Sequence, residues 1–318
     1  MTEPSLKIVA VAGTGVIGRG WIQVFSRAGC KTRVYDPDIN MANAALNWVE
    51  KDLKLDEADG FIKTDEIKSR LALISVHTDL EEALDGAEYI QENGPEQLEI
   101  KQSIFTQIDQ ISNPSAIIAS SASGLDINLI AAGLQGVSRC ILAHPFNPPH
   151  VIPAVEVLPT VKTSPEVIER ATVFLKSVGQ MPLLMNFHVD GFLGNRIQAA
   201  VVREAIHLVE RGVAGVEAVD AVISQGLGLR WALFGNFGVN NTNADGGIRE
   251  YYKKFGTAYK ESMNDLDSTA PSFDPEMIDR IAAGVEAMED GTSVAELSRW
   301  RDRLIRKIRR LKKDDPHP

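Results

Sequence analysis

The chain has 318 residues, of which 44% are hydrophobic and 24% are charged, and its formal net charge at pH 7 is −10. This length favours two domains, and the composition is typical of globular proteins. No apolar run reaches the roughly 18 residues of a membrane span, and the first residues lack the basic and apolar regions of a secretory signal. We therefore expect a cytoplasmic protein with no membrane partner. The acidic charge also disfavours nucleic acid as a partner, because it would repel phosphates.

The first predicted unit is a strand, a helix and a second strand. Residues 7–12 form a short, apolar and β-branched run, which indicates a buried strand. Apolar residues at helical spacing over 16–28 predict a helix, and Gly29 follows as its C-terminal cap. Residues 32–35 predict a second strand, which ends in Asp36. This order is one complete βαβ unit.

The turn between the first strand and the helix has the pattern Gly-x-Gly-x-x-Gly. Gly13 permits a tight turn, Gly15 lets the backbone approach a pyrophosphate, and Gly18 allows the helix to pack closely on the strand. Asp36 is placed to accept hydrogen bonds from both ribose hydroxyls and would repel a 2′-phosphate, so the cofactor is predicted to be NAD rather than NADP. The predicted cofactor-binding residues of this segment are Gly13, Gly15, Val16, Ile17, Gly18 and Asp36.

Further short apolar runs alternate with helical stretches or loops. They span residues 88–91, 116–120, 140–143, 155–157 and 181–184. This alternation predicts an α/β domain of the Rossmann type, in which a mostly parallel sheet carries helices on both faces. The polar, helix-prone stretch 43–70 is broken near Gly60, and we interpret it as a helical excursion from the sheet.

Cysteine and histidine usage gives two further expectations. Cys30 and Cys140 are the only cysteines, too few for a disulfide framework or a cysteine-based zinc site, and both lie beside apolar segments. We expect two buried free thiols. No pair of histidines has the spacing of metal ligands, so we expect no metal.

From residue 192 onward the pattern becomes helical. Residues 192–210 predict one long helix that ends at Gly212, and helical segments follow to the C-terminus. We therefore expect a Rossmann domain that binds NAD over residues 1–188 and an all-helical domain over residues 189–318.

The last predicted helix begins with a capping box, Ser293-Val-Ala-Glu296, in which each side chain can satisfy a backbone donor. Residues 299–313 carry nine Lys or Arg and one acid, so an arm that binds nucleic acid is conceivable. The spacing of the apolar residues favours instead an amphipathic helix that packs one stripe inward and exposes a basic side. The stripe consists of Leu297, Trp300, Leu304, Ile308 and Leu311.

Three polar segments follow predicted strands or open the long helix. Ser123 lies in a run of hydroxyl-bearing residues after a strand, at the sheet edge where open α/β sheets bind ligands. His144 follows the next strand, and Glu156 is embedded in an apolar strand, where a carboxylate is costly unless it has a partner. Asn195 lies in Gly-Phe-Leu-Gly-Asn-Arg at the start of the long helix.

These residue types suit the oxidation of an alcohol, in which the hydroxyl loses its proton as a hydride is transferred. His144 can take that proton near neutral pH. Glu156, bonded to the other ring nitrogen, would fix the tautomer and favour the imidazolium. Ser123 and Asn195 would hold the substrate oxygen and stabilise its developing charge. Each residue alone also has a structural interpretation, as a buried histidine, an ion-pair member, a turn residue or a helix-start residue, but the combination favours catalysis.

In these features the chain resembles the 3-hydroxyacyl-CoA dehydrogenase superfamily over nearly its whole length. The resemblance implies an NAD-binding Rossmann domain, a helical domain that serves substrate binding and commonly pairs two copies into a homodimer, and oxidation of a 3-hydroxyl group. It places the catalytic positions at Ser123, His144, Glu156 and Asn195. It also implies that Glu96 and Lys101 contact the cofactor.

Within the superfamily the chain is most similar to the lambda-crystallin or L-gulonate 3-dehydrogenase branch, which acts on small free hydroxy acids. The similarity lies in residues 225–232, 243–247 and 299–302. Arg230 therefore joins Ser123 and Asn195 as a candidate substrate-binding residue, because a guanidinium can bind a carboxylate with two parallel hydrogen bonds. The alternative is an ordinary surface arginine.

Other functions stay open at this point. Carnitine 3-dehydrogenases share a similar Gly-Leu-Arg-Trp stretch, and the aromatic side chains of Trp231, Phe234 and Phe237 could hold a trimethylammonium group or pack a core. A short-chain 3-hydroxyacyl-CoA is a further alternative, although residues 50–70 mix acids and bases and offer no clear basic surface for its phosphates. A crystallin-like structural protein could keep the cofactor pocket without turnover, but the intact set of four catalytic positions argues against it.

Overall fold

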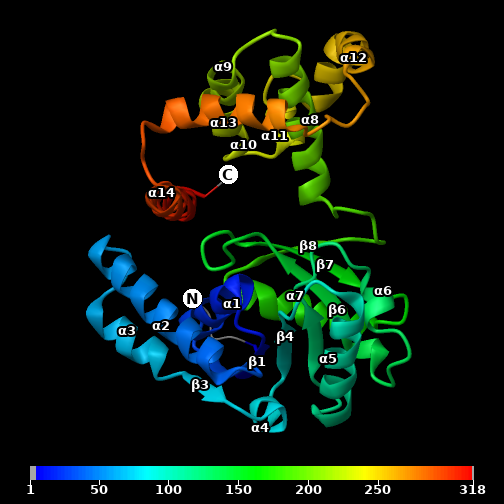
Figure 1. The fold of residues 1–318 in the computed structure, drawn as a ribbon. Coiled ribbons are helices and arrows are strands. Elements are labelled where there is room, and N and C mark those ends of the chain that lie inside the picture. The colour runs from blue at the N-terminus through cyan, green and yellow to red at the C-terminus, as the bar shows by residue number, and fades with distance from the viewer. Residues whose placement is uncertain (1–4, 317–318) are drawn as a thin grey trace. The chain divides into compact units, whose positions relative to one another are not determined.

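The computed structural model describes residues 5–316 and divides the chain into two compact units, one up to Leu193 and one from Gly194 onward (Figure 1). The first unit contains an eight-stranded sheet with helices on both faces, and the second unit is helical. These findings confirm the predicted fold class, an α/β Rossmann-type domain followed by an all-helical domain. Within residues 5–316, no helix is both long and apolar enough to cross a membrane.

The sheet has the strand order β3-β2-β1-β4-β5-β6-β7-β8, and neighbouring strands are parallel except for β6 with β7. The strands are β1 (Ile8–Ala12), β2 (Lys31–Tyr35), β3 (Ile74–His77), β4 (Tyr89–Glu92), β5 (Ile117–Ser120), β6 (Cys140–Pro145), β7 (Ala154–Pro159) and β8 (Met181–Leu184). The sequence analysis did not single out β3, because this edge strand is only partly buried and lacks a continuous apolar run.

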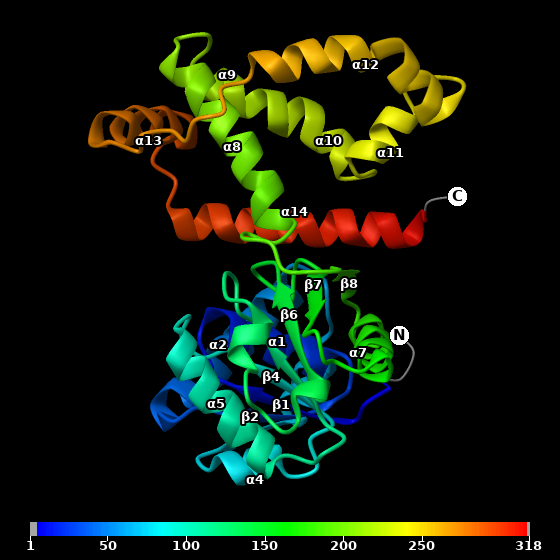
Figure 2. The ribbon, with the colours of Figure 1, turned by 90° about the vertical axis from the view of Figure 1, so that its right-hand side faces the viewer.

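Helices cover the two faces of this sheet (Figure 2). One face packs against α1 (Val16–Arg27), α2 (Ile39–Ala58), α3 (Thr64–Leu71) and α7 (Pro165–Ser177). The other packs against α4 (Leu80–Leu84), α5 (Leu98–Ile111) and α6 (Ile127–Ile130), and the 3-10 turn η1 (Val137–Arg139) precedes β6. Successive side chains of a strand point to opposite faces, so Val9 and Val11 enter one apolar cluster and Ala10 the other. The sequence of a strand that is buried on both faces is therefore a continuous apolar run.

The second unit consists of helices joined by loops. They are α8 (Gly194–Glu210), α9 (Val216–Ala221), the π-helical turn η2 (Val222–Leu227), α10 (Gly228–Trp231), α11 (Asn236–Asn241), α12 (Gly247–Asp265), α13 (Pro275–Glu289) and α14 (Val294–Asp314). The capping box predicted for the last helix is confirmed, since Ser293 and Glu296 each accept a backbone N–H of the other residue.

The predicted inward packing of the α14 stripe is wrong for this chain. No residue of α14 is buried: Leu297 and Leu304 are half-buried, whereas Trp300, Ile308 and Leu311 are exposed. Amphipathic spacing shows that a helix has an apolar side, but it does not show what covers that side.

Two other sequence expectations concern thiols and surface charge. Cys30 and Cys140 are both buried free thiols, as predicted, and burial raises the pKa of each to about 12, so both stay protonated.

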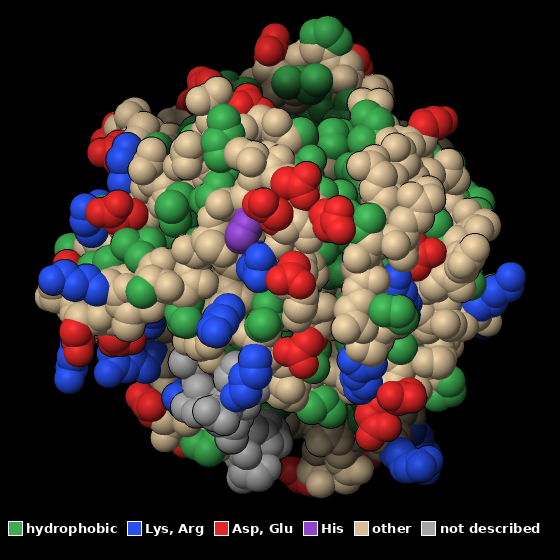
Figure 3. Space-filling model, turned by 90° about the horizontal axis from the view of Figure 1, so that it is seen from below, with side chains coloured by type: hydrophobic (Ala, Val, Ile, Leu, Met, Phe, Trp, Pro, Cys, Tyr) green, Lys and Arg blue, Asp and Glu red, His purple; other side chains and the backbone are tan. Residues whose placement is uncertain are grey.

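On the face that Figure 3 shows, acidic and basic side chains of the described residues are interspersed among apolar ones. That face therefore carries charges of both signs.

Hydrogen bonds of His207 connect the end of α8 to the segment between α12 and α13. Its side chain is buried, with Nδ1 at 2.9 Å from Glu210 Oε2 and Nε2 at 3.1 Å from the Thr269 carbonyl oxygen. Both partners are acceptors, so only the imidazolium satisfies both at once. The hydrogen bond to Thr269, followed by that to Glu210, raises the pKa of His207.

This pKa shift predicts a pH dependence of stability. A group with a raised folded-state pKa contributes fully below its unfolded pKa of about 6.5 and loses its contribution as the pH rises through the folded-state pKa. We expect the melting temperature of the wild type to fall over this window and His207→Gln to lack that decline, as measured by circular dichroism. His77→Gln, on the edge strand β3, is the control. An equal decline in wild type and His207→Gln would contradict the assignment.

Candidate active site

The parallel strands bring the predicted residues of the first unit to one edge of the sheet. The carboxyl ends of β1, β4, β5 and β6 share this edge, as their pairing registers show. The glycine turn follows β1, Glu96 follows β4, Ser123 follows β5, and His144 lies near the end of β6. Open α/β sheets bind their ligands at this edge.

The glycine turn has the shape that a pyrophosphate needs. Gly13 has a φ of 93°, and a Cβ there would lie 2.8 Å from the Asn93 carbonyl oxygen. A Cβ on Gly18 would collide with the Gly13 carbonyl, whereas one on Gly15 would meet nothing within 4 Å. Gly15 is the N-cap of α1 and provides no side-chain cap, and the first turn holds no acidic residue. The free N–H groups and the open space at Gly15 therefore suit an anionic group.

Asp36 connects the end of β2 to this turn. Its Oδ2 accepts hydrogen bonds from the backbone N–H of Thr14 at 2.9 Å and from the Thr14 hydroxyl at 2.6 Å. Oδ1 accepts from the backbone N–H of Asp38 at 3.1 Å. The carboxylate is thus fixed beside the glycine turn and remains only partly buried. Of the two other residues predicted here, Val16 is 54% exposed and Ile17 is half-buried.

His144 and Glu156 form a direct pair across the antiparallel strands β6 and β7. The two residues are register partners, so their side chains leave the sheet on the same face. His144 Nδ1 lies 2.7 Å from Glu156 Oε2. Glu156 is fully buried, and its Oε1 accepts a 2.7 Å hydrogen bond from the backbone N–H of Leu193. With Nδ1 held by the carboxylate, Nε2 is the nitrogen of His144 that can meet a ligand.

Phe192 supports this pair and was not identified from the sequence. Its ring is fully buried, and the ring centroid lies 5.3 Å from that of His144. Its backbone is left-handed, with a φ of 48°, a conformation that is uncommon for an aromatic residue. The next N–H along the chain, that of Leu193, is the one that reaches Glu156. Backbone strain of this kind is concentrated at functional sites.

The loop that carries Ser123 is held by Glu96. Glu96 Oε1 accepts hydrogen bonds from the backbone N–H of Ser123 at 2.8 Å and of Gly124 at 2.9 Å. Lys101, which the resemblance assigned to the cofactor, is buried, with its Nζ within 3.1 Å of both carboxylate oxygens of Glu92. The sequence analysis missed Glu92, although its signal, a carboxylate at the end of an apolar strand, is the one that identified Glu156.

Asn195 and Arg230 belong to the second unit. Asn195 is the second residue of α8, and its side chain is exposed. Arg230 lies in the short helix α10, and its positive charge acts on Tyr259 of α12. The structure thus places Arg230 near an aromatic cluster of its own unit. Of the aromatic residues predicted around Arg230, Phe237 is 69% exposed and therefore packs no core in this chain.

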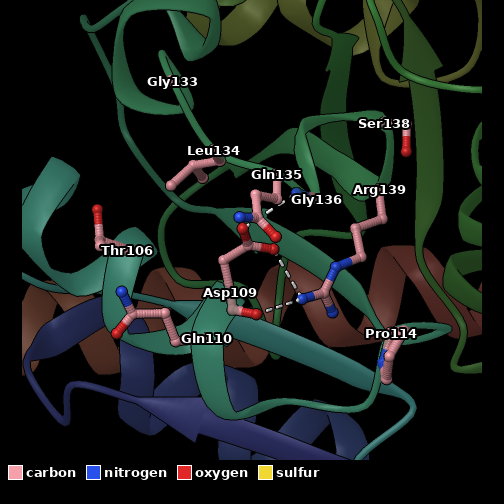
Figure 4. Close-up of a pocket in the computed structure, with 10 residues that line it drawn as sticks. All are labelled: Thr106, Asp109, Gln110, Pro114, Gly133, Leu134, Gln135, Gly136, Ser138 and Arg139. Carbon is pink, nitrogen blue, oxygen red and sulfur yellow. Dashed lines mark hydrogen bonds and ion pairs between the residues drawn. The ribbon is translucent and has the colours of Figure 1, made fainter.

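A cavity of about 650 Å³ lies at the opposite edge of the sheet (Figure 4). Its lining includes the segments that precede β5 and β6, and its charged groups are Asp109 and Arg139. Arg139 Nη2 lies 2.8 Å from Asp109 Oδ1. The other hydrogen bonds of the guanidinium go to Ser112 Oγ and to backbone carbonyls, so its donors are used by contacts within the fold. The candidate active site is therefore the one at the carboxyl edge.

Comparison with known proteins identifies the class. Residues 8–187 match the NAD-binding domain of 3-hydroxyacyl-CoA dehydrogenase, and residues 191–287 match the C-terminal domain of the same family. The chain therefore belongs to the 3-hydroxyacyl-CoA dehydrogenase family. The dehydrogenases among its relatives and the match to the NAD-binding domain make it an NAD-dependent enzyme that oxidises a hydroxyl group.

Individual relatives cover nearly the whole chain. The lambda-crystallin homolog of Bos taurus is 36% identical over 97% of this chain and 96% of its own length. The L-carnitine dehydrogenase of Bacillus cereus is 38% identical over 98% of this chain and 95% of its own length. Among solved structures, FadB2 of M. tuberculosis is 26% identical, with a TM-score of 0.68 over 88% of this chain and 94% of that one.

The position of Asp36 predicts cofactor selectivity. We expect Asp36→Asn to weaken NAD binding by about ten- to a hundredfold, since a charge-assisted hydrogen bond contributes about 1.5–3 kcal/mol, and to narrow the preference for NAD over NADP. Isothermal titration with both dinucleotides measures the two effects. Asp38→Asn, which removes the neighbouring acid but keeps an N-cap side chain for α2, is the matched control. Unchanged NAD affinity in Asp36→Asn would refute the assignment.

Proposed function

We propose that the protein oxidises the 3-hydroxyl of a small, polar, free hydroxy acid of the L-gulonate type to a ketone. The observation that carries this proposal is the 2.7 Å contact between His144 Nδ1 and Glu156 Oε2 at the edge that also bears the glycine turn. Support for a free acid comes from relatives such as the L-carnitine dehydrogenases, which match over nearly the full length of the chain.

In this proposal His144 is the general base. NAD, when bound, accepts the hydride from the carbinol carbon. Nε2 of His144 takes the hydroxyl proton, and Glu156 retains the proton on Nδ1 and stabilises the resulting imidazolium. The hydrogen bond from Leu193 to the second oxygen keeps the carboxylate in place. His144 then passes its proton to solvent, so the products are the ketone, NADH and one proton.

The other proposed roles follow from hydrogen-bonding capacity. The Ser123 hydroxyl and the Asn195 amide would hold the substrate oxygen and stabilise its partial charge. Arg230 would bind the substrate carboxylate. Gly13, Gly15, Val16, Ile17, Gly18 and Asp36 would bind NAD together with Glu96 and Lys101.

L-Carnitine is the second candidate substrate, favoured by an aromatic cluster in α12. Tyr251, Tyr252, Phe255 and Tyr259 have ring centroids between 5.0 and 6.4 Å apart for their closest pairs. Three of the rings are partly exposed, and the charge of Arg230 acts on Tyr259. Aromatic faces attract a trimethylammonium group, while the arginine would bind the carboxylate at the other end of the same molecule.

A substrate screen distinguishes the candidates. Purified protein with NAD is offered L-gulonate, L-carnitine, 3-hydroxybutyrate and 3-hydroxybutyryl-CoA, and NADH is followed by its absorbance. We expect the highest kcat/KM with L-gulonate or a related sugar acid. The highest value with L-carnitine would establish the second candidate, and turnover of the CoA thioester alone would refute the free-acid proposal.

Loss of the imidazole should abolish turnover and leave cofactor binding intact. We expect His144→Ala to lower kcat by about 10²- to 10⁴-fold and to bind NAD like the wild type, because His144 lies outside the glycine turn. Stopped-flow turnover and quenching of tryptophan fluorescence by NAD provide the two readouts, and His77→Gln is the control. A His144→Ala enzyme with wild-type turnover would place the base elsewhere.

Recognition of the carboxylate should depend on Arg230. We expect Arg230→Met to raise KM for the preferred free acid by about ten- to a hundredfold, the effect of a lost charge-assisted contact, with a smaller effect on kcat. Arg280→Met, at an exposed arginine of α13, is the matched control. Equal KM values for the wild type and Arg230→Met would leave the carboxylate without this partner and contradict the assignment.

We also propose that the helical unit pairs two copies of the chain. Its helices α8, α9 and η2 form a mostly apolar groove of about 480 Å³, lined by residues that include Leu208, Val219, Val222 and Ile223. Several large apolar side chains of the unit are more than half exposed, among them Leu229 and Trp300. Such surfaces are typical of protein interfaces, and sedimentation analysis of the purified protein would show whether it is a dimer.

A further inference from the structure

Glu92 is a buried carboxylate at the end of β4 that the proposed chemistry does not use. It is fully buried and accepts hydrogen bonds from the Ser120 hydroxyl and from the backbone N–H of Gly94, both at 2.6 Å. Lys101 Nζ approaches its two oxygens at 3.0 and 3.1 Å. A Cβ on Gly94 would lie 2.9 Å from Glu92 Oε1, so the glycine makes this close approach possible.

Lys101 joins this buried carboxylate to a more exposed one. Its side chain is 1% exposed, and its Nζ also donates to the Gly94 carbonyl at 3.1 Å. On the other side it lies 3.8 Å from Glu96 Oε2, whose side chain is 42% exposed. One ammonium group therefore lies between a carboxylate in the core and a carboxylate at the ligand-binding edge.

Glu96 completes the connection to the Ser123 loop. One of its oxygens faces Lys101, and the other accepts the N–H groups of Ser123 and Gly124. The contacts thus run without a gap from Glu92 in the core, through Lys101 and Glu96, to the backbone of the residue proposed to hold the substrate oxygen.

Energetics favour a positioning role over a purely stabilising one. A buried ion pair gains little over well-packed apolar side chains, because desolvation of both charges offsets their attraction. A cation held at a fixed point does, however, fix the direction of the flexible Glu96 side chain. Catalytic groups need such support, since displacement by about 1 Å can lower the rate a hundredfold.

We propose that Glu92 is a positioning residue that acts through Lys101 and Glu96 to hold Ser123 in place. This inference rests on the proposed function of Ser123, but the order of the loop can be measured without any substrate. Removal of the Glu92 charge lets Lys101 move toward Glu96, which weakens the hold of Glu96 on the N–H groups of Ser123 and Gly124.

A double-mutant cycle tests whether Glu92 acts through Lys101. The wild type, Glu92→Gln, Lys101→Met and Glu92→Gln/Lys101→Met are compared for kcat at saturating NAD and for hydrogen exchange of the amides of Ser123 and Gly124. We expect Glu92→Gln to lower kcat by about tenfold or more and to accelerate exchange at both amides. In the Lys101→Met background the same substitution should change neither quantity.

Two further variants separate positioning from general destabilisation. Asp109→Asn breaks a buried ion pair of similar kind at the opposite edge of the sheet, where Asp109 meets Arg139 at 2.8 Å and Gly136 N at 3.0 Å. It should lower the melting temperature but leave kcat and exchange at Ser123 unchanged. Glu96→Gln, at the exposed end of the connection, should accelerate exchange at Ser123 without disturbing the core.

The outcomes are distinct. The proposal would be overturned if Glu92→Gln lowered kcat by the same factor in the wild-type and Lys101→Met backgrounds. Unchanged exchange at Ser123 in a folded Glu92→Gln protein would also overturn it. Should Glu92→Gln fail to fold, unchanged exchange at Ser123 in Glu96→Gln would overturn it instead. If the wild type reduces no NAD with any hydroxy acid, the proposed function fails, while the exchange data still decide the role of Glu92.

Discussion

A single buried carboxylate, that of Glu156, constrains the chemistry that this edge of the sheet can perform. An ionised carboxylate without water is stable only when its oxygens are satisfied. Here one oxygen meets the imidazole of His144 and the other meets the N–H of Leu193. The antiparallel pairing of β6 with β7 makes the first contact possible, because it places the two residues opposite each other. Phe192, whose backbone is left-handed, directly precedes Leu193, whose N–H makes the second contact.

The same sheet edge combines this pair with a site for an anionic cofactor. The parallel order of β1, β4, β5 and β6 aligns the ends of four strands, so residues distant in sequence share one edge. The glycine turn offers unsatisfied N–H groups and open space, and the strand ends offer an imidazole and hydroxyls. The opposite edge holds the cavity lined in part by Asp109 and Arg139, which form an ion pair with each other. The candidate catalytic pair and the glycine turn thus lie at one edge of the sheet, and the ion pair of Asp109 with Arg139 lies at the other.

Much of this arrangement could be predicted from the sequence because its signals are local. The glycine turn, the strand before it and the capping box at Ser293 each depend on a few adjacent residues. The need of Glu156 for a partner was also predictable, since a carboxylate in an apolar strand is costly. The pairing of Glu156 with His144 was predicted from the chemistry of alcohol oxidation, but their register across antiparallel strands was not, because sequence periodicity carries no information on which strands become neighbours.

Other features could not be predicted for the same physical reason. The sequence did not indicate that the ammonium group of Lys101 lies in a network of contacts with Glu92, Gly94 and Glu96. A lysine is normally exposed, and only the fold shows that this one is buried. The α14 stripe was expected to pack inward, yet Trp300 and Ile308 are exposed. For Lys101 and for the α14 stripe alike, the sequence identified the side chains but did not show which groups they contact.

The central claim is that Glu156 fixes the tautomer of His144, so that Nε2 is the base. Nitrogen-15 NMR of the histidine-labelled protein in complex with NAD tests this most directly. The account predicts that the neutral form of His144 carries its proton on Nδ1 and leaves Nε2 bare, and that this preference is lost in Glu156→Gln. A neutral His144 that carries its proton on Nε2 in the wild type would contradict the account.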